Sequence, residues 1–149
     1  MARKPPPSAS RFWKVVNVGA AGNVLVYRLS GGRLFGRMGK APILLLHHVG
    51  RKSGKERVTP VLYLEDGGDL VVVGSKGGTD KTPAWFGNLV AAAETTVEVG
   101  REKRRVRPRR ATDEERDALW PRLVGMYPAL AEYQTFTDRK IPVAVLEPA

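Results

Sequence analysis

The chain has 149 residues, of which 42% are hydrophobic, and it contains no cysteine. It has 25 Lys and Arg residues against 15 Asp and Glu residues, which gives a formal net charge of +10. This size and composition fit one folded domain, and the lack of cysteine excludes disulfides, thiolate catalysis and zinc–thiolate sites. The excess charge indicates an anionic partner, such as a nucleic acid, an acidic membrane or a polyanionic small molecule, unless the cations are scattered over a solvated surface.

Residues 1–30 are expected to form a basic segment that precedes the main domain, predicted over 31–149. Residues 1 to about 10 are rich in proline and serine and predict a mobile tail. No stretch resembles a signal peptide or a membrane span, so we expect a cytoplasmic protein. The pattern from Phe12 to Tyr27 predicts two short helical pieces, broken near Gly19 and Gly22. They would either cap the core or rest on a membrane surface as a basic amphipathic segment.

The next part of the chain predicts an antiparallel meander. A glycine-rich basic connector over 31–40 leads into three apolar strands, at Ile43–His48, Val58–Glu65 and Leu70–Val73. The run from Gly50 to Arg57 joins the first two strands, and Asp66–Asp69 has the composition of a hairpin turn.

The second half adds helices and further strands. A helix is predicted with Thr82 as its N-cap and Pro83 at its first position, and a second helix begins at a capping box that Thr112 opens. Pro128 ends that helix and a shorter helical piece follows. The remaining strands are predicted at Thr95–Val99, Lys103–Arg110 and Ile141–Leu146. About six strands, mostly adjacent in sequence, with three or four helices predict an α+β fold: an antiparallel barrel with helices packed outside.

The run Gly50–Arg57 places four cations and two glycines in one loop. It is not the phosphate loop of nucleotidases, because its spacing is one residue short and a strand follows it. Its amides and basic side chains still suit an anion, although a solvated hairpin tip is the alternative. The glycine-rich loop Gly74–Gly78 leaves the sheet at the same end, next to the start of the Pro83 helix. Together they predict a groove for an elongated anionic ligand.

Other candidate chemistry is weak. His47 and His48 point to opposite faces of a strand and no acidic cluster accompanies them, so no metal site is expected. Ser75 has no histidine at a suggestive spacing for a hydrolytic triad. The acids at Asp113–Glu115 are explained as first-turn helix charges. If the protein is an enzyme, a cofactor should carry the reaction.

Several motifs together resemble the deazaflavin-dependent nitroreductase family, in order from about Arg37 to Pro148. They are Gly50–Gly54 with Arg57, Thr59–Pro60, Ser75–Gly78, Pro83–Trp85, Asn88–Leu89, Trp120–Pro121, Met126–Pro128, Tyr133–Gln134, Thr137–Arg139 and Ile141–Pro142. Members of that family are actinobacterial enzymes that use reduced coenzyme F420, an elongated polyanionic deazaflavin. They share the split β-barrel of flavin-binding oxidoreductases, so the resemblance implies a barrel of six to seven strands.

The resemblance also implies roles for particular residues. The cofactor phosphate would be held by Arg51, Lys52, Ser53, Gly54 and Arg57, and its acidic tail by Lys55. The deazaflavin ring would meet Ser75, Lys76 and Gly77, with Pro60, Val61, Trp85 and Asn88 nearby. Ser75, Tyr127 and Tyr133 would be the catalytic set, with the two tyrosines on the substrate side. Hydride would pass from the ring to a quinone or an activated nitro compound.

Two further positions concern the choice of acceptor. Some relatives carry tyrosines where this chain has Leu62 and Leu130. These leucines make the implied pocket more apolar, which favours quinones over bulky nitroimidazoles.

Three alternatives stay open at this point. The same fold could hold FMN instead of F420. The basic stripe Lys103–Arg110 could bind nucleic acid, although few aromatic residues are interleaved with it. The basic N-terminal segment could bring the enzyme to the inner face of the membrane, where lipid-soluble quinones reside.

Overall fold

The computed structural model describes residues 4–7 and 22–149 of the chain. The strands are β1 (Arg37–Met38), β2 (Ala41–Val49), β3 (Glu56–Asp66), β4 (Asp69–Val73), β5 (Thr95–Val99), β6 (Glu102–Arg110) and β7 (Val143–Pro148). Residues 22–30 are helical. The other helices are the 3₁₀ turn η1 (Lys76–Gly78), α2 (Ala84–Ala91), α3 (Asp113–Met126) and α4 (Ala129–Thr135).

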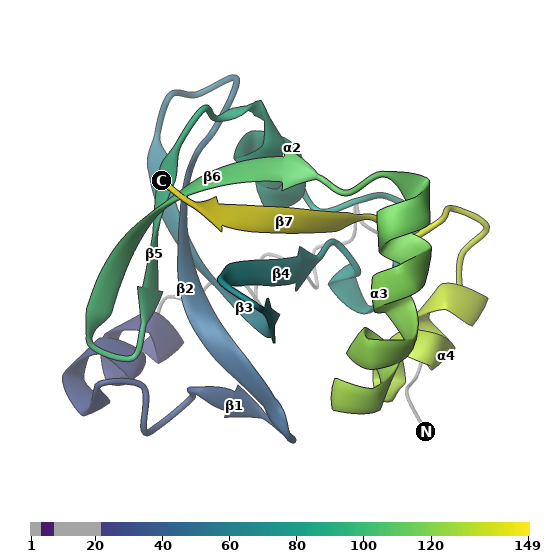
Figure 1. Ribbon diagram of the computed structural model, residues 1–149, viewed down its shortest axis with the longest axis horizontal. Coiled ribbons are helices and arrows are strands. Elements are labelled where there is room, and N and C mark those ends of the chain that lie inside the picture. The colour runs from purple at the N-terminus through teal and green to yellow at the C-terminus, as the bar shows by residue number, and fades with distance from the viewer. Residues whose placement is uncertain (1–3, 8–21) are drawn as a thin grey trace.

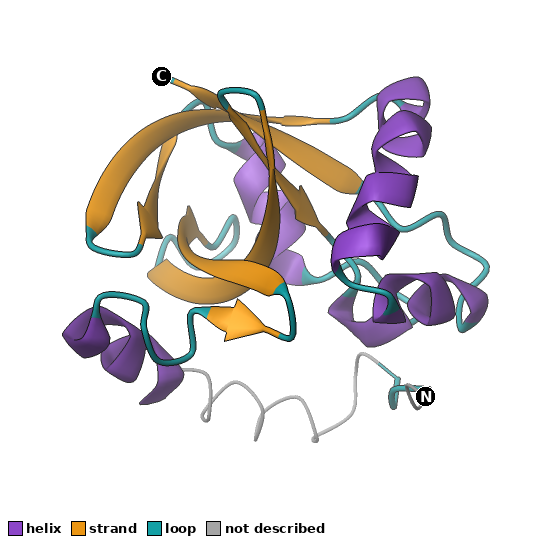
Figure 2. Ribbon diagram, turned by 60° about the horizontal axis from the view of Figure 1, so that its bottom comes forward, coloured by secondary structure: helices purple, strands orange, loops and turns teal. Residues whose placement is uncertain are grey.

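Six of the strands close into an antiparallel barrel, in the order β2-β3-β4-β7-β6-β5, and β5 pairs back with β2. The short strand β1 is added to the edge of β2 (Figure 1). Helices α3 and α4 pack outside the barrel on one side (Figure 2), while Phe86 and Leu89 of α2 insert into its interior. The expected split β-barrel with external helices is confirmed.

Alternation along the strands explains both layers of the core. In β4, Leu70 and Val72 face the barrel interior, while Val71 and Val73 face the cluster that α3 and α4 cover. Both faces of the strand are therefore buried, which is why β4 reads as a continuous apolar run rather than an alternating one.

The predicted capping box is confirmed in full. Thr112 Oγ1 accepts a hydrogen bond from the Glu115 N–H at 3.2 Å, and Glu115 Oε1 accepts one from the Thr112 N–H at 3.1 Å. These two bonds satisfy backbone donors that would otherwise lack partners at the start of α3.

Several sequence-based element bounds are wrong, and three of the differences have a physical explanation. The N-cap of α2 is Pro83 and not Thr82, because Thr82 Oγ1 instead lies 3.4 Å from the guanidinium of Arg139. The last strand begins at Val143 rather than Ile141, whose N–H donates to the Gln134 side chain instead of to a strand. The connector over 31–40 contains β1, which the glycine-rich composition concealed.

Helical residues 22–30 cap the outer face of β2. Val24 and Tyr27 pack on Ile43 and Leu45, and the Tyr27 hydroxyl donates to the Ile43 carbonyl at 3.0 Å. The predicted helical piece that begins at Phe12 lies outside the described residues, as does most of the predicted mobile tail. In the part of the chain that the structure describes, no helix is both long and apolar enough to span a membrane.

Candidate functional site

The loop between β2 and β3 is tightly folded by its own backbone. The Gly50 N–H donates to the Lys55 carbonyl at 3.0 Å, and the Gly54 N–H donates to the Gly50 carbonyl at 2.8 Å. Gly54 has φ +67°, and no atom lies within 4 Å of where its Cβ would be, so glycine is favoured here for its backbone conformation. Ser53 Oγ accepts the Lys55 N–H at 3.2 Å. The loop backbone is thereby fixed while its long side chains reach solvent.

The basic side chains of this loop are exposed and unneutralised. Arg51, Lys52, Lys55 and Arg57 are all exposed, and within the described residues no ion pair involves any of them. The loop also contains the exposed Glu56, which forms no ion pair with these four cations among the described residues, so the loop keeps an excess of positive charge that can attract an anion.

The basic stripe on β6 differs in this respect. Arg104 is paired with Glu102 at 3.1 Å, Arg105 with Glu94 at 3.3 Å, and Arg109 with Glu115 at 2.7 Å. These arginines are partly neutralised within the protein. The structure thus distinguishes two basic segments that look alike in sequence.

Helix α2 supports the loop Gly50–Arg57, called the cationic loop below. The Arg51 guanidinium lies across Gly87, where an added Cβ would come within 2.8 Å of Nη2 and 3.1 Å of Cζ. The next residue, Asn88, accepts the Arg51 N–H through Oδ1 at 3.4 Å. The loop and the helix are therefore in direct contact through Arg51 and Asn88.

His48 orients Asn88 from inside the barrel wall. Asn88 Nδ2 lies 3.2 Å from His48 Nδ1 and donates to it, which leaves His48 Nε2–H to donate to Thr59 Oγ1 at 2.9 Å. Burial, with smaller contributions from Arg57 and His47, lowers the pKa of His48 to about 4, so the ring is neutral near pH 7. Sequence reasoning weighed His48 only as a metal ligand and missed this role. No cluster of potential metal ligands occurs among the residues described.

The loop Gly74–Gly78, called the Ser75 loop below, has an unusual backbone. Lys76, Gly77 and Gly78 all have positive φ, at 42°, 65° and 80°, and such a conformation costs free energy for a residue with a side chain. Gly78 is packed against α4, since a Cβ there would overlap the Tyr133 carbonyl, and Pro5 from the N-terminus lies next to Gly77. Burial lowers the pKa of Lys76, opposed by Asp80.

Tyr127 and Tyr133 meet beside this loop. Their hydroxyl oxygens are 3.4 Å apart, with ring centroids separated by 6.2 Å. Burial, followed by the hydrogen bond with Tyr127, raises the pKa of Tyr133. Tyr133 therefore stays a neutral phenol near pH 7 and can donate a proton or a hydrogen bond. Leu130 is fully buried in the cluster against which both tyrosines and Leu62 pack.

Helix α2 connects the two loops. It begins shortly after the Ser75 loop, and about 6 Å further along its axis Asn88 reaches the cationic loop. Trp85 lies between them and is partly buried, in an edge-on contact with Phe86. Pro60 is half-exposed on β3, whereas the Val61 side chain is only 8% exposed and faces the barrel interior. The structure thus brings Arg51 and Asn88 together, whereas the Val61 side chain points into the barrel interior.

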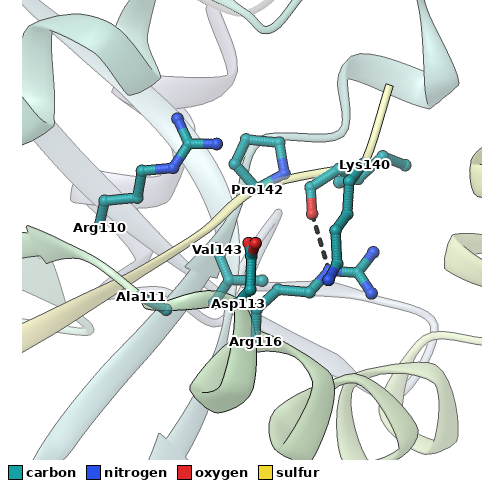
Figure 3. Close-up of a pocket in the computed structure, with 8 residues that line it drawn as sticks. Arg110, Ala111, Asp113, Arg116, Lys140, Pro142 and Val143 are labelled. Atoms are coloured by element: carbon teal, nitrogen blue, oxygen red, sulfur yellow. Dashed lines mark hydrogen bonds between the residues drawn. The ribbon is translucent and has the colours of Figure 1, made fainter. Parts of the chain in front are cut away.

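A small cavity lies at the start of α3, and one of its lining residues, Pro142, accepts the Gly74 N–H at 2.9 Å. It measures about 20 Å³ and is bordered by Arg110, Asp113, Arg116 and Lys140 among others (Figure 3). This space suits a water molecule and is far too small for a cofactor.

Comparison with known proteins identifies the family of this chain. The sequence profile of the F420H(2)-dependent quinone reductase family matches residues 21–148. The chain belongs to this family. It is therefore an F420-dependent oxidoreductase, and the family selects coenzyme F420 over FMN.

Individual relatives are similar over most of their length. A protein of Mycobacterium tuberculosis that is provisionally named an F420H(2)-dependent quinone reductase is 42% identical over 107 residues, which are 72% of this chain and 90% of that one. Another F420H(2)-dependent quinone reductase of the same species is 36% identical over 81% of this chain and 84% of its own. The solved structure of an F420-H2 dependent reductase has a TM-score of 0.64 and 41% identity, and the match covers 71% of this chain and 94% of that protein.

The residues present fit coenzyme F420. A phosphodiester and an oligoglutamate tail need an excess of cations, and the four exposed loop cations Arg51, Lys52, Lys55 and Arg57 supply it against the single acid Glu56. A ring needs close approach to backbone, which the missing side chain of Gly77 favours, and Pro5 lies beside this position. The donor set thus matches an elongated cofactor with a charged end and a flat end.

Proposed function

We propose that this protein binds F420H2 along α2 and reduces a quinone beside Tyr127 and Tyr133. The observation that carries the proposal is the arrangement of the two loops. The unneutralised cationic loop contacts α2 at Gly87 and Asn88, while the Ser75 loop precedes the same helix and packs on α4, which carries Tyr133.

Each part of the site has a distinct task. Arg51, Lys52, Ser53, Gly54 and Arg57 hold the phosphate with charge-assisted hydrogen bonds, and Lys55 attracts the acidic tail. When bound, F420H2 supplies the hydride. The Ser75–Gly77 loop holds the ring in a fixed orientation, so that much of the rate comes from positioning.

The tyrosines complete the reduction of the acceptor. A quinone that accepts a hydride also takes up one proton to become a hydroquinone. Tyr133, which remains protonated near pH 7, can donate that proton or a hydrogen bond to the quinone oxygen, and Tyr127 is placed to replenish it through their 3.4 Å contact.

Quinones are the favoured acceptors and activated nitro compounds are secondary ones. The cluster beneath the tyrosines is apolar and includes Leu62 and Leu130, which suits a flat lipophilic quinone. Stopped-flow mixing of the protein with F420H2 and menadione, and separately with a nitroimidazole, tests this order. We expect rapid loss of the F420H2 signal with menadione and slow loss with the nitro compound. No oxidation with any of several quinones would refute the proposal.

We further propose that the N-terminal part of the protein contacts an acidic membrane. Apolar side chains are exposed on the helical residues 22–30, the turn after them and β1, namely Leu25, Leu29, Leu34, Phe35 and Met38 at 49–74% exposure. The exposed cations Arg33, Arg37 and Lys40 lie in the same segment of the chain. Exposed apolar groups together with cations favour the interface of an anionic bilayer.

Vesicle sedimentation tests this contact. Phosphatidylglycerol vesicles should retain the protein more than neutral phosphatidylcholine vesicles, and Leu29→Ser with Phe35→Ser should release it. Val49→Ser is the matched control, because Val49 is 50% exposed but lies at the other end of β2. Sedimentation that is unchanged by the double substitution or by removal of residues 1–30 would refute the contact.

A further inference from the structure

The Ser75 loop is held by one side chain that sequence reasoning gave no role. Arg139, between α4 and β7, donates through Nη1 to the Gly74 carbonyl at 3.2 Å, through Nη2 to the Ser75 carbonyl at 2.9 Å and through Nε to the Thr79 carbonyl at 2.9 Å. Its Nη1 also lies 3.4 Å from Thr82 Oγ1. The planar fork of arginine therefore ties the end of β4 to the residues that precede α2.

This contact decides which way the loop amides point. In a trans peptide the carbonyl and the following N–H point in opposite directions, and the described residues contain no cis peptide. Because the Gly74 and Ser75 carbonyls face Arg139, the N–H groups of Ser75 and Lys76 face the other side of the loop. The Ser75 N–H on that side of the turn can donate to an electron-rich ligand atom.

The backbone conformation of the Ser75 loop requires stabilising contacts such as those of Arg139. Lys76 has φ 42°, a conformation that is unfavourable for a residue with a Cβ and that persists only where surrounding contacts enforce it. Arg139 supplies those contacts at the carbonyls on both sides of the strained turn.

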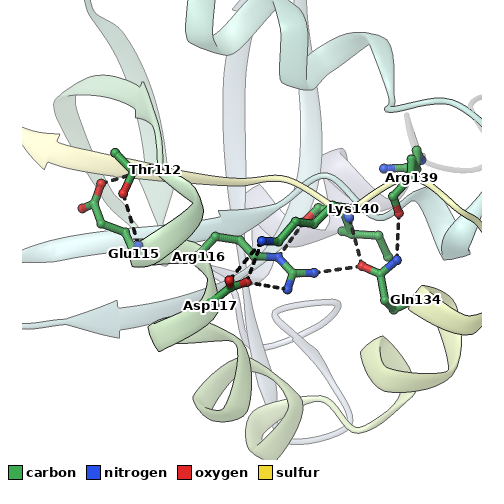
Figure 4. Close-up of polar contacts among 8 residues, drawn as sticks. Thr112, Glu115, Arg116, Asp117, Gln134, Arg139 and Lys140 are labelled. Carbon is green, nitrogen blue, oxygen red and sulfur yellow. Dashed lines mark hydrogen bonds and ion pairs between the residues drawn. The ribbon is translucent and has the colours of Figure 1, made fainter.

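Arg139 is itself fixed to α4 and α3. Gln134 Nε2 donates to the Arg139 carbonyl at 2.7 Å, and Gln134 Oε1 accepts from Arg116 Nη2 at 2.8 Å (Figure 4). Arg116 is buried, and its guanidinium lies 3.9 Å from the centroid of the Trp120 ring. Gln134 directly follows Tyr133 in α4. The loop and the substrate-side tyrosine thus share one hydrogen-bonded frame.

We propose that Arg139 is a positioning residue for the flat end of the cofactor. It directs the Ser75 amide toward the deazaflavin ring and keeps it in register with Tyr133. The inference rests on the proposed function, since it concerns the ring side of that same site. It assigns the ring side to Arg139 and leaves the phosphate side to the cationic loop.

Binding of two forms of the cofactor tests this division. Dissociation constants for F420 and for the deazaflavin chromophore without its phosphate and glutamate tail are measured by fluorescence titration for Arg139→Gln and Arg139→Lys. We expect Arg139→Gln to weaken both ligands by the same factor, of about tenfold or more, because hydrogen bonds from a charged group are lost. Arg139→Lys should retain part of the affinity. Arg51→Ala should weaken only the tailed cofactor.

Amide hydrogen exchange without ligand supplies a second measurement. Residues 75–79 should exchange faster in Arg139→Gln than in the parent protein. Arg122→Gln is the matched control: this exposed arginine binds Asp66 and the Glu65 carbonyl on the far side of α3, and its loss should change neither exchange in the loop nor affinity.

The outcomes separate this inference from the proposed function. Unchanged affinity for both ligands together with unchanged exchange in Arg139→Gln, or a loss confined to the tailed cofactor, would overturn the role of Arg139. A parent protein that binds no F420 would overturn the proposed function. Amide hydrogen exchange of residues 75–79 would then still test whether Arg139 fixes the backbone of the Ser75 loop. If Arg139→Gln does not fold, Arg139→Lys serves for every measurement.

Discussion

Replacing Gly87 by alanine should stabilise the protein and weaken cofactor binding at the same time. Gly87 lies in the middle of α2, where alanine is more favourable than glycine by about 0.8–1.0 kcal/mol. For a domain of this size, that gain corresponds to a rise in Tm of about 2–4 °C. The added Cβ would lie 2.8 Å from Arg51 Nη2, whereas carbon contacts are ordinarily about 3.5–4.0 Å.

The guanidinium must therefore move by roughly 0.7–1.2 Å. This movement is inexpensive for the fold, because the displaced atoms are at the end of a flexible side chain. The movement keeps the charge of Arg51 but misaligns the hydrogen bonds that we propose it donates to the cofactor phosphate. We therefore expect a smaller loss of binding free energy than the roughly 1.5–3 kcal/mol of a deleted charged hydrogen bond. A loss of about 1 kcal/mol weakens F420 binding roughly fivefold.

Thermal unfolding and fluorescence titration with F420 measure the two effects on one variant. Gly125→Ala is the control, because a Cβ added to this α3 glycine would have no atom within 4 Å, and it should leave F420 affinity unchanged. An unchanged F420 affinity in Gly87→Ala would show that the position of Arg51 does not matter for binding. A lowered Tm would show that the helix cannot accept the extra carbon.

Further substitutions test other parts of the site and fold. Arg57→Ala should weaken F420 binding by about 1.5–3 kcal/mol, and an unchanged titration would exclude Arg57 from the site. Tyr133→Phe should lower kcat with menadione about tenfold, as expected for one lost hydrogen bond, while F420 affinity stays the same; a parallel loss of affinity would contradict a substrate-side role. His48 has a pKa of about 4 in the fold against an ordinary 6.5, so the unfolded chain takes up the proton first. The free energy of unfolding should be highest above pH 6.5 and fall as the pH drops toward 4. A fall in Tm with pH that is equally steep in His48→Gln would show that His48 does not cause this pH dependence. Thr112→Ala should lower stability by about 1 kcal/mol through loss of the capping box without changing quinone reduction, and an unchanged Tm would count against the cap.

Local chemistry explains why much of the fold was predictable. The capping box depends on Thr112 and Glu115, which are three residues apart, and the hairpin at Asp66–Asp69 depends on adjacent turn residues. Apolar runs such as Leu70–Val73 mark strands because their both-sided burial leaves a continuous signal. The errors occurred at the bounds of elements. Thr82 was predicted from local sequence as the N-cap of α2, but its hydroxyl lies 3.4 Å from Nη1 of Arg139, which is distant in the chain.

The individual strands, the family motifs and the presence of a cationic loop at Gly50–Arg57 follow from the amino-acid sequence alone, because each of them is read from residues close together in the chain. The folded structure was needed to show which cations form ion pairs, since Arg105 and Arg109 of β6 meet acids from other parts of the chain. It was also needed to show what fixes the site. The Arg51 contact with Asn88 joins residues 37 positions apart, and the Arg139 contact with Ser75 joins residues 64 apart. Local patterns carry no information about such pairs, because closure of the barrel brings them together.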